Sequence, residues 1–214
     1  MPTTPENAHE TLQAIRGMME RSGRFISLSG LSGVSAGVFA LLGAAAAIWY
    51  LGATPFDGVP TYYEDAVAST RGGMKFTTFF LLDAGLVLVA ALTAGIFFTI
   101  RRARRAGQAV WGPLTVRLLT HLAIPLAAGG LFCIALMLQG AYSLVAPATL
   151  VFYGMALLNG SKYTVDDIRK LGIVEIVLGI IGSFFPGYGL ELWAVGFGVL
   201  HIVYGIIMWN KYER

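Results

Sequence analysis

Long apolar runs separated by short polar segments dominate the chain. Each run is at least 18 residues long, and a helix of about 20 residues crosses the roughly 30 Å hydrocarbon core of a bilayer. The runs are continuously apolar and do not alternate, which argues against membrane-spanning strands. We therefore expect an all-α integral membrane bundle of six transmembrane helices. The predicted spans are 25–51, 76–100, 116–138, 142–159, 168–185 and 188–209.

Lysine and arginine are concentrated in the connections on one side of these spans. That side holds thirteen of the fifteen basic residues, and the opposite side holds only Arg71 and Lys75. Since cytoplasmic loops carry the excess of positive charge, both termini are predicted to be cytoplasmic. We expect a bacterial inner (plasma) membrane protein with a cytoplasmic amphipathic segment over 1–24, a transmembrane domain over 25–210 and a cytoplasmic tail over 211–214.

Composition agrees with this class of protein. Hydrophobic residues make up 56% of the chain and charged residues only 13%, against about 45–50% and 25% in soluble domains. The net charge of +3 comes from residues beside the spans, so no nucleic-acid partner is expected. The expected partner is the lipid bilayer, and a homo-oligomer remains open. The longest predicted outer loop, 52–74, is either a binding loop or a solvated connector.

Small residues at helical spacing predict where the helices pack, because they let two backbones approach closely in a bilayer. Gly33 and Gly37 form such a pair in the first span. The last two spans each combine a glycine face with an ionisable residue. Glu175 shares its face with Gly172, Gly179 and Gly182, whereas His201 shares its face with Gly198 and Gly205.

Four ionisable side chains lie away from the ends of the predicted spans, namely Asp83, His121, Glu175 and His201. Each charge at the centre of a span costs about 2.5–3.5 kcal/mol, so each marks a candidate site. Glu175 and His201 are expected at the same depth of one antiparallel hairpin. We predict that they are hydrogen-bonded, directly or through one water, across a single glycine-lined seam. Asp83 lies in the outer half of the second span.

His121 lies four residues before Pro125 in the third span. Proline has no backbone N–H, so the carbonyl group of His121 loses its helical partner. An ionisable side chain and a free carbonyl group therefore coincide at this position. This is a weak indication of a functional site.

Three hypotheses for the intramembrane residues stay open. Glu175 and His201 form a polar pair that only holds the hairpin together, or they share a proton in a pH sensor or a proton-coupled small-solute transporter. In the third hypothesis His121, Glu175 and His201 bind zinc or haem. No cofactor is predicted, because ligand spacings such as HExxH are absent. Enzyme motifs such as GxSxG and the P-loop are absent too, so no catalytic residue is assigned and a non-enzymatic protein is favoured.

The last hairpin, residues 172–208, consists of two apolar helices joined by a Phe-Pro-Gly turn and punctuated by glycine. Its pattern of Gly179, Pro186, Gly187, Gly198 and Gly205 resembles the two-helix unit of six-span bacterial inner-membrane proteins of the HdeD-like acid-resistance group. The chain departs from that group in its charged Glu175 and in its long first outer loop. The resemblance implies a structural or stress and homeostasis role in the membrane, without catalysis.

Overall fold

The computed structural model describes residues 29–58, 63, 70–107 and 109–214 of the chain. This part of the chain is all-α apart from one small hairpin, which confirms the expected all-α class. Its helices are α2 (Gly30–Leu51), α4 (Phe76–Arg105), α5 (Pro113–Leu138), α6 (Val145–Gly160), α7 (Asp166–Phe184), α8 (Gly189–Trp193) and α9 (His201–Tyr212). A π-helical segment, Ala194–Leu200, joins α8 to α9, so these three form one continuous rod. Short 3-10 turns occupy Tyr142–Leu144, Ser161–Tyr163 and Pro186–Tyr188.

The small hairpin consists of strands β1 (Thr70–Arg71) and β2 (Met74–Lys75), which pair antiparallel with Thr70 opposite Lys75. Gly72 and Gly73 form the turn with positive φ angles of 61° and 78°, which glycine adopts without strain. The hairpin leads into α4, and the hydroxyl group of Tyr50 on α2 donates a hydrogen bond to the carbonyl oxygen of Met74 at 2.9 Å. The hairpin thus ties α2 to the start of α4.

Length and hydropathy identify five membrane-spanning helices in the described part of the chain. They are α2, α4, α5, α6 with its flanking turns, and the α8–α9 rod. α7 is not among these, because its 19 residues carry two acidic and two basic residues near its start as well as Glu175. Large apolar side chains on α4 and α5, such as Leu86 and Leu131, are each 70% exposed. The chain is therefore a multi-pass helical membrane protein with surfaces suited to contact with lipid.

The amphipathic segment expected over 1–24 lies outside the described residues, as does much of the 52–74 loop.

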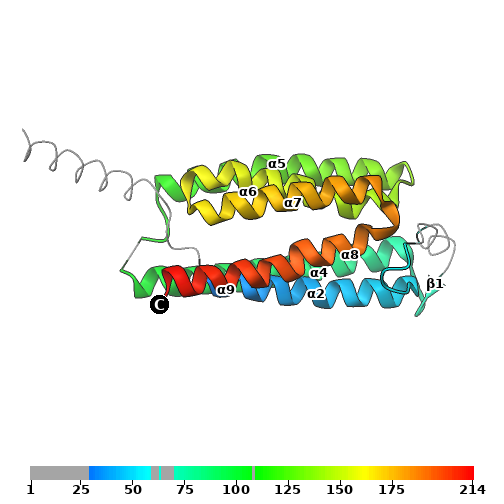
Figure 1. Ribbon diagram of the computed structural model, residues 1–214, viewed down its shortest axis with the longest axis horizontal. Coiled ribbons are helices and arrows are strands. Elements are labelled where there is room, and N and C mark those ends of the chain that lie inside the picture. The colour runs from blue at the N-terminus through cyan, green and yellow to red at the C-terminus, as the bar shows by residue number, and fades with distance from the viewer. Residues whose placement is uncertain (1–28, 59–62, 64–69, 108) are drawn as a thin grey trace, which may run out of the picture.

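The helices of the described part of the chain form two groups of three, with the α8–α9 rod counted as one helix. Figure 1 shows these groups as an upper and a lower layer. We call α5, α6 and α7 the central group, and α2, α4 and the α8–α9 rod the terminal group. The arginine-rich end of α4 and the C-terminus lie at the same end of the molecule.

Glycine contacts hold the terminal group together. A Cβ atom on Gly37 of α2 would lie 2.5 Å from the carbonyl oxygen of Gly198, and a Cβ atom on Gly33 would lie 3.2 Å from the Cα atom of Gly205. These distances leave no room for side chains, so the two backbones are in direct contact. Gly33, Gly37, Gly198 and Gly205 all belong to this α2–rod seam.

A second glycine seam joins α7 to α6 in the central group. A Cβ atom on Gly172 would lie 2.8 Å from the carbonyl oxygen of Gly154, and one on Gly179 would lie 2.7 Å from that of Pro147. Gly182 packs against the ring of Pro147. The prediction of one shared seam between the last two helices is therefore wrong. Their glycine faces pack against different helices, because α6 and α2 offer the complementary small surfaces.

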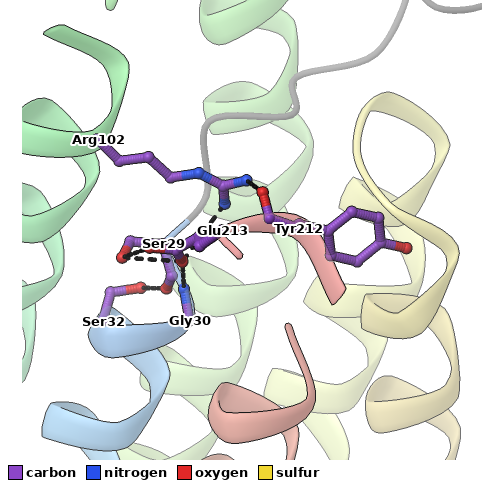
Figure 2. Close-up of polar contacts among 6 residues, drawn as sticks. All are labelled: Ser29, Gly30, Ser32, Arg102, Tyr212 and Glu213. Carbon is purple, nitrogen blue, oxygen red and sulfur yellow. Dashed lines mark hydrogen bonds and ion pairs between the residues drawn. The ribbon is translucent and has the colours of Figure 1, made fainter. Parts of the chain in front are cut away.

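The C-terminal residues fasten the ends of several helices, as Figure 2 shows. The carboxylate of Glu213 accepts hydrogen bonds from the backbone N–H of Gly30 and, at 3.2 Å, from the hydroxyl group of Ser29. Arg102 of α4 lies 3.6 Å from this carboxylate and donates a 2.9 Å hydrogen bond to the carbonyl oxygen of Tyr212. A negative charge at the N-terminus of α2 is favourable because unpaired N–H groups point there.

The same C-terminal residues also contact the central group. Asp167, at the start of α7, is only 6% exposed. It accepts hydrogen bonds of 2.9 Å from the ammonium group of Lys211 and from the hydroxyl group of Tyr212, and Lys170 adds an ion pair at 3.7 Å. We call Lys211, Tyr212 and Glu213 the C-terminal clasp, because they connect α2, α4 and α7.

Replacing Gly37 by alanine tests the α2–rod seam. The new methyl group meets the carbonyl oxygen of Gly198, so the helices must separate, and we expect a loss of about 1–3 kcal/mol of stability. Gly95→Ala on α4 is the matched control, because nothing lies within 4 Å of its Cβ position. There we expect a gain of about 0.5–1 kcal/mol from helix propensity. The free energy of unfolding in detergent measures both changes. Equal changes in the two variants would contradict a direct backbone contact between α2 and the rod.

Replacing Asp167 by asparagine tests the clasp through its pH dependence. The hydrogen bond from Lys211 is the largest influence that lowers the pKa of Asp167, and burial opposes it. Because the pKa of Asp167 is lower in the folded than in the unfolded state, its carboxylate stabilises the protein at pH values above the unfolded pKa of about 3.9. This stabilisation disappears as the pH falls through the folded pKa. We expect the melting temperature of Asp167→Asn in detergent to be about 2–4 °C lower than that of the parent at pH 7. The difference should vanish in strong acid, and a constant difference would exclude the ionised pair.

Candidate functional site

Glu175 and His201 come together where the two helical groups meet. Glu175 projects from α7 and is 0% exposed, whereas His201 begins α9 and is 6% exposed. The Nδ1 atom of His201 lies 3.5 Å from the Oε1 atom of Glu175. Two ionisable side chains from different groups are thus buried together inside the bundle.

His201 makes its hydrogen bonds to other partners. Its Nδ1 atom lies 3.0 Å from the carbonyl oxygen of Gly196, and its Nε2 atom lies 2.7 Å from the hydroxyl oxygen of Tyr153 on α6. A carbonyl oxygen only accepts, so Nδ1 carries the hydrogen, and Nε2 of a neutral ring accepts from the Tyr153 hydroxyl group. The direct form of the expected hydrogen bond between Glu175 and His201 is therefore wrong, because the Gly196 carbonyl group accepts the hydrogen of Nδ1.

The π-helical segment shapes the space around Glu175. A Cβ atom on Gly196 would collide with the Oε2 atom of Glu175 and with the side chain of Leu150, so only glycine leaves room for the carboxyl group. π-helical turns are rare and often occur at functional sites. Phe197 in the same segment lies nearly parallel to the His201 ring, with centroids 5.8 Å apart. Glu175, His201, Tyr153 and Gly196 form what we call the buried cluster.

The Glu175 carboxyl group is unusual within this cluster. Both of its oxygens are buried and neither has a hydrogen-bond partner among the described residues. Buried polar side-chain atoms nearly always have a partner, and leaving one without costs about 1–3 kcal/mol or more. A pair that serves only to hold two helices together would be expected to form the missing hydrogen bond. Because the unpaired carboxyl group of Glu175 lowers the stability of the protein, its presence needs an explanation other than a contribution to stability.

His121 belongs to a separate polar contact on the far side of α6. Its Nε2 atom lies 2.9 Å from the hydroxyl oxygen of Tyr163. Its carbonyl oxygen accepts a 3.3 Å hydrogen bond from the side-chain amide of Asn159. The α5 helix is continuous through Pro125, so Asn159 supplies the partner that the proline removes. The carbonyl group of His121, which Pro125 leaves without a helical partner, therefore has a structural role as the acceptor for Asn159.

The arrangement of these residues does not fit a metal or haem site. His121 and His201 each use the Nε2 atom in a contact with a different tyrosine. In the described part of the chain, no three His, Cys, Asp or Glu side chains lie close enough together to hold a metal ion. His121, Glu175 and His201 therefore do not form a common ligand set.

Asp83 lies apart from the buried cluster, in a groove between α2 and α4. Its carboxyl oxygens face Gly43 of α2, where an added Cβ atom would lie 3.5 Å from both. The structure therefore places the four intramembrane ionisable residues at three locations, and it brings together only Glu175 and His201.

Three residues of these sites were not singled out from the sequence. Tyr153 has no distinguishing neighbours in its apolar run, and its contact with His201 depends on how α6 and α9 cross. Gly196 is one of many glycines, and its role follows from the π-helical turn. Asn159 offered a signal, since it is a polar residue within a predicted span with a large hydrogen-bonding capacity. The sequence alone could therefore have paired Asn159 with the carbonyl group of His121, which loses its helical partner to Pro125.

Comparison of the chain with protein families, with curated proteins and with solved structures finds no match.

Proposed function

We propose that this chain is a non-enzymatic membrane protein of the homeostasis type, in which the buried cluster binds a proton. The observation that carries the proposal is the fully buried Glu175 carboxyl group, whose two oxygens have no hydrogen-bond partner among the described residues. An isolated charge in this setting is very costly, so the packed bundle holds Glu175 with its proton. The nearest atom of His201, Nδ1 at 3.5 Å, already carries a hydrogen that it donates to the Gly196 carbonyl group, so it does not accept this proton.

The position of the cluster links this proton to the packing of the two helical groups. Glu175 and Tyr153 belong to the central group, whereas His201 and Gly196 belong to the terminal group. Loss of the proton places a charge directly at the contact between the groups. That charge is relieved when the groups separate far enough to admit water. Protonation of Glu175 is therefore a means by which pH favours the closed bundle.

This proposal is favoured over transport of a solute through the cluster. Glu175 is 0% exposed, so the packed bundle offers no path of molecular width to it. It is also favoured over a purely structural pair, because such a pair would satisfy its hydrogen bonds.

We further propose that α7 is the sixth span and that both termini are cytoplasmic, in a bacterial inner membrane. The 19 residues of α7 extend about 28 Å at 1.5 Å per residue. Its charged residues other than Glu175 gather in the first five positions, where they can reach headgroups. They lie at the same end as the arginines of α4 and the C-terminus, as expected for a cytoplasmic end.

Replacing Glu175 by glutamine tests proton binding. A glutamate side chain in the unfolded chain has a pKa of about 4.3. If the folded bundle keeps that proton, the parent loses stability as the pH rises, by up to about 1.4 kcal/mol per pH unit. Glutamine cannot lose a proton, so we expect a much flatter profile for Glu175→Gln. The free energy of unfolding in detergent, measured between about pH 5 and pH 8, gives both slopes.

Two further variants serve as controls. Glu191→Gln makes the same chemical change on the α8–α9 rod, where the carboxylate accepts a 3.1 Å hydrogen bond from the backbone N–H of Phe56, and should keep the parental slope. Tyr153→Phe removes the hydrogen bond to His201 but no carboxyl group, so it should lower stability equally at every pH. A slope in Glu175→Gln as steep as that of the parent would refute the proposal.

A further inference from the structure

A groove on the side of the molecule that faces lipid contains the second unusual carboxyl group. It lies between α2 and α4, has a volume of about 290 Å³, and is lined by Phe39, Leu42, Gly43, Asp83, Val87 and Ala90, among others. Leu42 and the neighbouring Leu86, at its edges, are 62% and 70% exposed. The groove is therefore open sideways, toward the acyl chains of the bilayer.

Asp83 is the acidic residue among the lining side chains. No hydrogen bond or ion pair connects it to any other described residue. It lies seven residues after the start of α4 at Phe76, about 10 Å along the helix. Ionisable residues within spans almost always have a partner or face a functional cavity. Here the groove is present, and no partner lies among the described residues.

The residue opposite Asp83 on α2 is a glycine. Gly43 is buried, and a Cβ atom added to it would collide with Val87 of α4. The same Cβ atom would lie 3.5 Å from both carboxyl oxygens of Asp83, so the carboxyl group lies directly against α2. The remaining walls are apolar, and Phe39 adds an aromatic ring of the kind that attracts cations.

We propose that this groove binds lipophilic organic cations that enter it from the bilayer. An apolar cation partitions into the membrane, where the attraction of a carboxylate is much stronger than in water. The apolar walls take up its hydrocarbon surface, and Asp83 supplies the opposite charge. A metal ion does not fit, because the described lining residues offer only one carboxylate. Anionic lipid headgroups are repelled by the same charge.

Binding of tetraphenylphosphonium to the full chain in nanodiscs of zwitterionic lipid tests this site. Equilibrium dialysis, corrected with empty nanodiscs, should show saturable binding to the parent. Asp83→Asn should weaken it by at least about ten-fold, which corresponds to the loss of one ion pair. Asp83→Glu should retain binding, because it keeps the charge. Tetraphenylborate, which has the same shape and the opposite charge, should not bind saturably.

Asp57→Asn is the matched control, because it removes one acidic charge from the loop after α2 and should leave binding unchanged. The melting temperature of each variant shows whether it is folded. Equal binding of tetraphenylphosphonium to the parent and to a folded Asp83→Asn would overturn the proposal. So would saturable binding of tetraphenylborate to the parent. A shift from dimer to monomer in Asp83→Asn, with binding unchanged, would instead assign the groove to a contact between two copies of the chain.

Discussion

Direct contact between helix backbones at glycine is the interaction on which this structure depends. In a bilayer, helices gain no hydrophobic energy from meeting, so close packing must hold them together. Gly37 against Gly198 joins α2 to the α8–α9 rod, and Gly172 against Gly154 joins α7 to α6. Each seam joins two helices of one group. The boundary between the two groups is where polar side chains meet, and there the contacts are of a different kind.

The buried cluster lies on that boundary, and its chemistry follows from how the seams direct the side chains. With its glycine face turned to α6, α7 presents Glu175 toward Gly196 of the rod. With its glycine face turned to α2, the rod presents His201 toward Tyr153 of α6. The hydrogen bonds of His201 are complete, whereas Glu175 has none among the described residues. The bundle is therefore close-packed around a carboxyl group that has no hydrogen-bond partner among the described residues, and on this we base the proposal that it holds a proton.

Much of this arrangement was predictable from the sequence. Five of the six expected spans are supported by length and hydropathy, because a bilayer imposes a minimum apolar length. The proximity of Glu175 and His201 follows from equal depth in one hairpin, since helical rise is constant. The partner of each glycine face was not predictable, because small surfaces are alike in sequence. The π-helical turn was not predictable either. The carbonyl group of its Gly196 competes with Glu175 for the Nδ1 hydrogen of His201.

The most direct test of the central claim is an infrared spectrum of the purified protein in lipid near neutral pH. A protonated carboxyl group has a carbonyl stretching band that a carboxylate lacks. Because every carboxyl group of the protein contributes to this spectral region, the informative quantity is the difference between the parent and Glu175→Gln. The account predicts that a band of a protonated carboxyl group is present in the parent and lost in the variant. A difference spectrum that shows only the loss of a carboxylate would contradict it.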